Sequence, residues 1–207
     1  VSGMVNYLIV LFAITLVYFA AAERLIIYTR LIGLQGLLLC GTAFFELKEV
    51  NTGNLVFIIA ESFLFKAILI PWILVRIIKR SGVSKVHSQA MPGFYLLIFS
   101  ILALLISVIL ANSLINPYIN KIYMVIALFS LLTGLLLIVT HRLIISHLIG
   151  FLIIENAVFI FSLAIGSEMP MLINIGILLD IFVGVLILGF FGLRLKAHTN
   201  ELTMLKD

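Results

Sequence analysis

The sequence predicts an all-α integral membrane protein, built as a bundle of seven transmembrane helices. Of its 207 residues, 64% are apolar and only 11% are charged. A soluble domain is usually about half apolar with about a quarter of its residues charged. This composition therefore excludes a water-soluble enzyme and a disordered chain. The apolar residues are enough for six or seven spans of about 20 residues each, so we expect one membrane domain over residues 1–207 with no separate catalytic domain.

The predicted spans are apolar runs separated by short polar segments. Each run is long enough to cross a hydrocarbon layer of about 30 Å at a rise of 1.5 Å per residue. The longest polar link, residues 79–91, is basic and ends before Pro92, a residue suited to starting a helix. The N-terminal run shows no basic segment or cleavage site of a signal peptide, so we expect it to be a retained span. The seven runs are Met4–Ala22, Leu25–Phe45, Leu55–Ile78, Gly93–Ala111, Ile122–Thr140, Leu143–Ile165 and Met171–Leu195.

Basic residues in the loops and near the ends of the spans predict the orientation of the bundle. With seven spans, one side of the membrane has only Lys48 and Lys121. Because cytoplasmic loops are enriched in Lys and Arg, the other side is expected to be cytoplasmic, with the N-terminus outside and the C-terminus inside a prokaryotic cell (inner) membrane. The cytoplasmic set is Arg24, Arg76, Lys79, Arg80, Lys85, Arg142, Arg194, Lys196 and Lys206.

Neither the charge nor the single cysteine indicates another class of site. The basic residues are not interleaved with aromatic residues, so nucleic-acid binding is not expected. Cys40 alone cannot form an intrachain disulfide, a structural zinc site or an iron–sulfur cluster. We therefore expect no cofactor in this chain.

Two segments of the sequence resemble each other. The motif RLII begins at Arg24 and again at Arg142, and each copy is followed by LIG and an apolar helix. The next spans also correspond, since each has an acid, Glu61 or Asp180, followed by an arginine about 15 residues later. We infer two parallel three-helix units, residues 1–80 and 119–207, joined by residues 81–118, which hold the basic loop and one linking helix.

Four ionisable residues at membrane depth are the main candidates for function. They are Glu61, Lys66, Glu155 and Asp180. A charge at mid-span costs about 2.5–3.5 kcal/mol on translocon scales, so such residues face the interior of a bundle or water. Glu155 and Asp180 have similar depth, and Lys66 is a candidate counter-charge. Glu61 and Lys66 are five residues apart, or about 140° around an α-helix, so we expect them to face different neighbours. A row of these groups is suited to proton relay.

Uncharged polar residues and histidines extend this set. Asn156 and Asn174 are candidate hydrogen-bonding partners of the acids, and Gln35 lies in the second span. His141 and His147 are near the predicted cytoplasmic end of the sixth span, where they could supply protons or simply be interfacial residues. Pro71 is expected to kink the third span one turn after Lys66. The alternative is that the charges only form ion pairs that fix helix packing.

Several segments resemble the hydrogenase 4 component E family. The resemblance is carried by Glu155-Asn156, Pro170, Gly176, Asp180 and the tail Leu202-Thr203-x-Leu205-Lys206, and upstream by Gln35 and Lys66-x-x-Leu69-x-Pro71. It is closest over the last two spans and the tail, and loose elsewhere. The two three-helix units are similar to subunit K of respiratory complex I and to the small subunit of multisubunit sodium/proton antiporters. Two positions depart from the pattern: Asn174, where the family often has an acid, and Glu61, where a small or apolar residue is expected.

The resemblance implies a membrane subunit of a complex I-like, group 4 [NiFe] hydrogenase or formate hydrogenlyase-type complex. The expected partners are the lipid bilayer, antiporter-like membrane subunits and a membrane anchor subunit, within a hetero-oligomer. The nickel–iron centre and the iron–sulfur clusters would then belong to partner subunits, and this chain would contribute to proton or sodium translocation without being catalytic itself. The alternatives are a structural scaffold that conducts no ions, a small subunit of a multisubunit cation/proton antiporter, and an independent secondary transporter.

Overall fold

The computed structural model describes residues 2–22, 24–46, 52–81, 93–114 and 116–165, and their regular structure is helical. The α-helices α3 and α4 are joined without a break by the π-helix η1, so that residues 52–81 form one continuous rod. The elements are α1 (Ser2–Ala21), α2 (Leu25–Glu46), α3 (Thr52–Ala60), η1 (Glu61–Leu69), α4 (Ile70–Ser81), α5 (Gly93–Ser113), α6 (Lys121–Thr140) and α7 (Ile144–Ile165). The predicted all-helical fold is confirmed for these residues.

Six helical segments in the described part of the chain are long and apolar enough to cross a membrane. They coincide with the first six predicted spans, with ends that differ by a few residues. The predicted seventh span, Met171–Leu195, lies outside the described residues. The described part of the chain therefore fits a multi-pass membrane protein.

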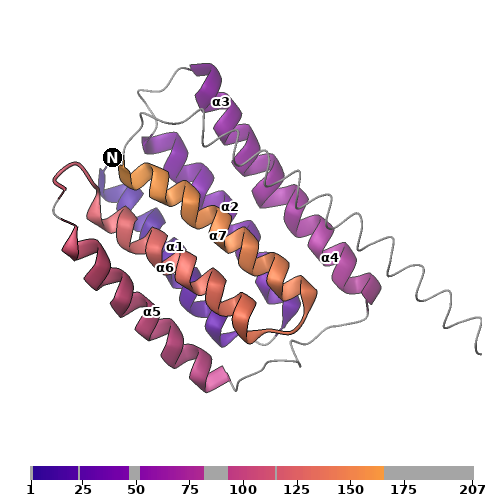
Figure 1. Cartoon of the computed structure of the whole chain (residues 1–207). Helices are drawn as coiled ribbons and strands as arrows, with labels where there is room; N and C mark the ends of the chain where they lie inside the picture. Colours follow the sequence, from indigo (N-terminus) through magenta and orange to yellow (C-terminus); the bar gives the residue numbers. More distant parts are fainter. Residues whose placement is uncertain (1, 23, 47–51, 82–92, 115, 166–207) are drawn as a thin grey trace, which may run out of the picture.

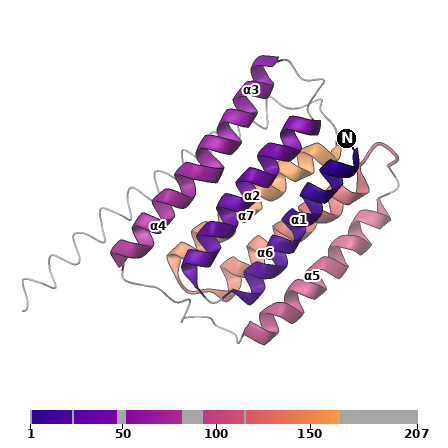
Figure 2. The same cartoon turned by 180° about the vertical axis from the view of Figure 1, so that it is seen from behind.

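Four helices form the centre of the bundle. Helices α1, α2, α6 and α7 pack together, with α1 against α2 and α6, and α7 against α2 and α6. Helix α5 lies along one side of this group, against α1 and α6, and the rod of α3, η1 and α4 lies along the other side, against α2 (Figure 1). The view from behind shows the same order of helices (Figure 2).

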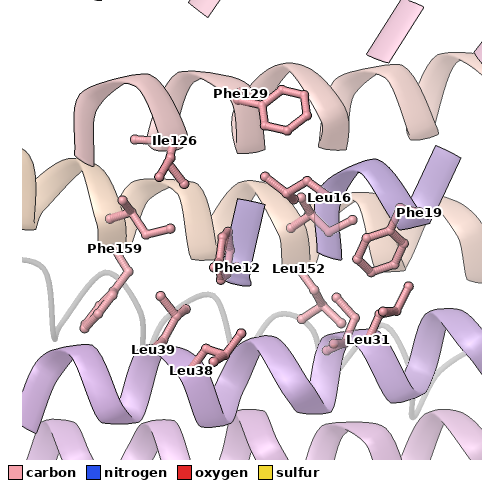
Figure 3. Close-up of a cluster of buried hydrophobic side chains, with 14 of the residues drawn as sticks. Phe12, Leu16, Phe19, Leu31, Leu38, Leu39, Ile126, Phe129, Leu152 and Phe159 are labelled. Carbon is pink, nitrogen blue, oxygen red and sulfur yellow. The ribbon is translucent and has the colours of Figure 1, made fainter. Parts of the chain in front are cut away.

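The outer surface is apolar, and polar side chains lie inside. Phe94, Ile101 and Ile109 on α5 are all more than half exposed, while Gln35 and Ser130 are fully buried. This distribution is the reverse of that in a soluble protein and is expected when lipid covers the outside. The centre itself is filled by large apolar side chains from α1, α2, α6 and α7, among them Phe12, Leu39 and Phe129 (Figure 3).

The burial pattern follows the spacing of the predicted internal repeat. Arg24 and Arg142 are 118 residues apart. A shift of 118 residues also places most buried positions of α1 on buried positions of α6, and the shifted helices occupy similar places in the bundle, beside α2 and α7 respectively. The matching pairs are Val5 and Tyr123, Ile9 and Ala127, Phe12 and Ser130, Thr15 and Thr133, Leu16 and Gly134, and Phe19 and Leu137. The span predicted as the third helix of the second unit, Met171–Leu195, lies outside the described residues.

Glycines set the two closest helix contacts. A Cβ atom on Gly134 would lie 2.7 Å from the carbonyl oxygen of Gly150, and one on Gly150 would lie 2.8 Å from that of Gly134, so α6 and α7 touch through their backbones. A Cβ atom on Gly36 of α2 would lie 2.8 Å from the backbone nitrogen of Ala67 in η1. Small residues allow this kind of approach between membrane helices. The second contact holds η1, and with it Lys66, against the centre of the bundle.

Candidate functional site

The buried polar residues of the site come from four helical elements and lie near the middle of their spans. Lys66 is close to the centre of the continuous rod that runs from Thr52 to Ser81. Glu155 and Gln35 are likewise close to the centres of α7 and α2. These three side chains and Thr15 of α1 are at most 5% exposed. The expected mid-span depth of Lys66 and Glu155 is therefore confirmed.

Lys66 and Glu155 form a buried ion pair. Lys66 Nζ lies 3.0 Å from Glu155 Oε1, and each residue is 3% exposed. Glu155 Oε1 has this ionic contact but no hydrogen bond of good geometry. The ammonium group also lies 5.5 Å from the centre of the Phe159 ring, one turn along α7, at a distance suited to a cation–π contact. Lys66 is thus the counter-charge of Glu155, as their positions within the predicted spans suggested.

A chain of hydrogen bonds leads from this pair across the bundle. Lys66 Nζ donates to Asn156 Oδ1 at 3.5 Å, and Asn156 Nδ2 donates to Gln35 Oε1 at 3.1 Å. Gln35 Nε2 donates to Thr15 Oγ1 at 2.8 Å, and Thr15 donates to the Phe12 carbonyl at 2.6 Å. This series of hydrogen bonds joins four elements: α1, α2, α7 and η1.

In this series of hydrogen bonds, every donor lies on the Lys66 side of its acceptor. An ammonium group can only donate, so Asn156 must present its oxygen to Lys66 and its nitrogen to Gln35. Because the oxygen of Gln35 accepts from Asn156, its nitrogen faces Thr15. The amides are therefore oriented so that Asn156 accepts from the Lys66 ammonium group. The groups that can gain or lose a proton are Lys66 and Glu155.

The π-helix η1 places Lys66 on this face of the rod. At its end, the Ile70 N–H bonds to the Phe65 carbonyl, five residues earlier. Pro71 follows directly, and because proline has no N–H it cannot bond to the Ala67 carbonyl. That carbonyl lies 3.3 Å from the position a Cβ atom would take on Gly33 of α2. Single π turns are often found at functional sites, and here one turn contains the buried lysine.

This π-helix changes the relation expected between Glu61 and Lys66. The expectation of different faces assumed an α-helix, in which five residues turn about 140°. Both residues lie in η1, where hydrogen bonds join residues five apart. Their backbone positions are therefore one π-helical turn apart, and the separation expected around the helix was wrong.

A second polar contact lies at one end of the bundle. The Tyr28 hydroxyl of α2 lies 3.3 Å from His141 Nε2, which follows the end of α6. His141 Nδ1 lies 3.0 Å from Thr140 Oγ1 and 3.1 Å from the Leu137 carbonyl. Tyr28 is fully buried and His141 is 3% exposed. Loss of hydration is the main cause that lowers the pKa of His141 from its ordinary value of 6.5, with a smaller effect from His147 in the same direction, partly offset by the Leu137 carbonyl.

The two histidines predicted near this end have different surroundings. His147 lies in the first turn of α7, is only partly buried, and its Nδ1 is 2.8 Å from the Leu143 carbonyl. His141 is instead enclosed between α2 and α6. Neither histidine contacts the Lys66–Glu155 pair, which lies two helical turns along α2 from Tyr28, at the level of Gln35.

Some predicted site residues lie beyond what the structure describes. Asp180 and Asn174 fall outside the described residues, as do Pro170, Gly176 and the tail from Leu202. Among the residues that are described, no group of three His, Cys, Asp or Glu side chains is placed to hold a metal ion. Cys40 is a free thiol there, and its Sγ is 3.9 Å from the Ile59 carbonyl.

The sequence prediction missed three residues of functional interest. Thr15 looks like an ordinary polar residue in an apolar helix, and only its contact with Gln35 reveals its part in the network. Tyr28 likewise looks like one of several aromatic residues in its span, and only its contact with His141 distinguishes it. Arg30 had a clearer signal, because it is a cation inside the second span, five residues after Leu25.

No protein-family model, curated protein or solved structure matches this chain.

Proposed function

We propose that this chain is a non-catalytic membrane subunit of a complex I-like respiratory or hydrogenase complex, in which it contributes to proton or sodium translocation. The observation that carries the proposal is the Lys66–Glu155 ion pair, with its atoms 3.0 Å apart and both residues 3% exposed in the middle of apolar helices. Ionisable residues at this depth are costly and usually mark ion pathways. The resemblance of the sequence to component E of hydrogenase 4 supports the choice of complex.

The ion pair can exchange one proton with its surroundings. A proton that reaches Glu155 neutralises the carboxylate, and Lys66 then loses its counter-charge. The ammonium group then passes a proton on, which leaves both groups neutral. The pair thereby takes up a proton at one group and gives one up from the other, while Asn156, Gln35 and Thr15 keep Lys66 in position. In this proposal Asp180 continues the path.

The redox chemistry belongs to partner subunits in this proposal. The nickel–iron centre and the iron–sulfur clusters of such a complex need several cysteine ligands, and this chain has one cysteine. The partners proposed are antiporter-like membrane subunits and a membrane anchor subunit. The chain would connect them to the redox arm within the bilayer.

The test replaces Glu155 in the assembled complex. The chain is tagged in its host, and inverted membrane vesicles from Glu155→Gln and Lys66→Met strains are assayed for ion uptake driven by the complex, together with electron transfer. We expect ion uptake to fall by about tenfold or more, with electron transfer retained. Thr42→Val and Thr133→Val are matched controls, because both threonines are buried but bond only to the backbone of their own helix. Normal ion uptake in both charge variants would disprove the relay.

A structural scaffold is the second candidate, and the closed network favours it. Each donor from Lys66 to Thr15 already has a fixed acceptor, as expected of a lock between helices. The scaffold predicts that the same variants lose the complex on a native gel instead of uncoupling it. Mass spectrometry of the subunits that co-purify with the tagged chain separates a redox complex from a multisubunit antiporter.

A further inference from the structure

A cluster of cations lies along one flank of the contact between α2 and α4. The two helices are antiparallel, because Gly33 of α2 faces Pro71 and Gly36, further along α2, faces Ala67, earlier in the rod. A Cβ atom on Gly33 would lie 3.2 Å from Pro71 Cγ, so these two residues mark the line of contact. The positions of neighbouring residues around each helix follow from this line at about 100° per residue.

Arg30 and three residues of α4 turn to the same side of that line. Arg30 lies one turn before Gly33, about 60° around α2 from the contact. On α4, Trp72, Arg76 and Lys79 lie about 100°, 140° and 80° around from Pro71. Because the helices run in opposite directions, these rotations bring all four residues to one flank of the contact. All four are exposed.

The cations of this flank have no acidic partner in the described part of the chain. The one ion pair among the described residues is that between Lys66 and Glu155. The Arg76 guanidinium instead stacks on the Trp72 ring, with Cζ 4.4 Å from the ring centre. Stacking leaves the N–H groups at the edge of the guanidinium free to donate to an anion.

The depth of the cluster matches the headgroup region of a bilayer. Arg30 lies five residues after the start of α2, so its Cα is about 7–8 Å inside the helix end, and a long arginine side chain can reach back to the interface. Arg76 and Lys79 lie in the last two turns of α4, at the same end. Trp72 lies one turn deeper than Arg76 on the same helix.

We propose that this flank, defined by Arg30, Trp72, Arg76 and Lys79, binds the phosphate headgroup of an anionic phospholipid. Two guanidinium groups and an ammonium group, which have no acidic partner among the described residues, are complementary to a phosphodiester. Arginine binds phosphate oxygens in a bidentate manner. The acyl chains extend along the exposed apolar side chains of the rod, such as Ile68, which is 51% exposed. The bound lipid supplies a counter-charge to Arg30, which has none among the described residues.

The single tryptophan of the chain reports directly on this site, because it is Trp72. The purified chain is reconstituted in phosphatidylcholine vesicles that contain phosphatidylglycerol with brominated acyl chains, which quench tryptophan fluorescence on contact. A parallel sample carries the bromine on phosphatidylcholine. We expect Trp72 to be quenched more by the anionic lipid, with a relative affinity above one that falls roughly two- to fivefold in Arg30→Gln and in Arg76→Gln.

Arg142→Gln is the matched control, because Arg142 is an exposed arginine at the same end of the bundle but between α6 and α7. It should keep the preference of the wild-type chain. Equal quenching by the two lipids would overturn the proposal, and so would a preference that survives both Arg30→Gln and Arg76→Gln. Inorganic phosphate is added as a competitor to wild type and to Arg142→Gln. If it removes the lipid preference of both proteins, the site binds free phosphate and the lipid assignment is wrong.

Discussion

Lys66 and Glu155 stabilise each other, because among the described residues neither has another counter-charge. Removal of one partner of a buried ion pair leaves an uncompensated charge and costs about 3–5 kcal/mol, while replacement of both partners is often close to neutral. The neighbouring amides cannot take over, since Asn156 and Gln35 are committed to their own partners. We therefore expect the loss of one charge to destabilise the bundle more than the loss of both charges.

The first prediction concerns this balance. Lys66→Met should lower the midpoint of thermal unfolding more than the double variant Lys66→Met with Glu155→Gln, because the double variant leaves no buried charge. The measurement follows the reaction of a thiol dye with Cys40, the single and only partly exposed cysteine. Additive losses in the double variant would show that the two charges are not coupled.

The second prediction concerns acid sensitivity at His141. Burial lowers its pKa below 6.5, so above pH 6.5 the neutral imidazole is present in both folded and unfolded states. As the pH falls below 6.5, the unfolded state binds a proton first and stability decreases, by up to about 1.4 kcal/mol per pH unit until the lower pKa of the folded state is reached. His141→Gln should flatten this part of the curve, measured as the midpoint of thermal unfolding by circular dichroism between pH 7.5 and 5.

A curve of unchanged slope in His141→Gln would assign the acid sensitivity to another group. The other three histidines and all the carboxylates are common to both proteins, so the difference between the two curves isolates His141. Tyr28 is the side chain from α2 that faces it, and Thr140 and His147 are its neighbours in sequence.

Single residues of the site differed in how well they could be predicted. Lys66 and Glu155 stand out in the sequence, because a charge in an apolar run has few acceptable surroundings. The bonds of Gln35 with Asn156 and Thr15 depend on the rotation and tilt of three helices. Sequence periodicity does not give these quantities when nearly every position is apolar, so Thr15 could not be singled out.

At the scale of elements, the contact of α2 with η1 determines where Lys66 lies. Gly36 approaches the backbone at Lys66 and Ala67, and Gly33 approaches Pro71 and the Ala67 carbonyl. Close packing of this kind cannot relax by rotating a side chain, since the atoms opposite Gly36 belong to the backbone. The glycines of α2 thus position the ion pair without taking part in it.

The third prediction tests this contact. Gly36→Ala would place a Cβ atom 2.8 Å from the Ala67 nitrogen and the Lys66 carbonyl carbon, so it should destabilise the bundle by about 1–3 kcal/mol through overpacking. Gly53→Ala is the control, because nothing lies within 4 Å of a Cβ atom at that position in α3. The readout is the midpoint of thermal unfolding by circular dichroism. Equal effects of the two substitutions would contradict the proposed role of Gly36.

The helices themselves were predictable because hydrophobic length is a strong signal in a membrane protein. Span ends such as Thr140 and Ile165 were predicted correctly to the residue. The change to a π-helix over residues 61–69 was not, although Pro71 was identified as a disturbance of its helix. A proline can be accommodated by a kink or by a π turn, and packing against α2 decides between them.

At the scale of the whole molecule, the fold buries its polar groups among apolar core residues and leaves apolar side chains on its outer surface. Tyr28 and His141 join diagonal helices at one end of the central group, and the Lys66 network joins its middle. The burial pattern repeats after 118 residues, in agreement with the repeat of RLII. By this repeat, the predicted seventh span, Met171–Leu195, corresponds in sequence to the rod of α3, η1 and α4.

The last prediction concerns the direction in which the bundle crosses the membrane. The ends of α6 and α7 near Arg142 are on the same side as Arg24, Arg76 and Lys79, whereas the link between α5 and α6, around Asn116, is at the opposite end. The excess of cations predicts that the Arg142 side is cytoplasmic. In a Cys40→Ser background, a cysteine at the exposed position Asn116 should react with an impermeant thiol reagent in intact cells or spheroplasts. A cysteine at the exposed position Arg142 should react only after the membrane is opened. The opposite labelling pattern would reverse the orientation, and would also place the cation flank of α2 and α4 in the outer leaflet.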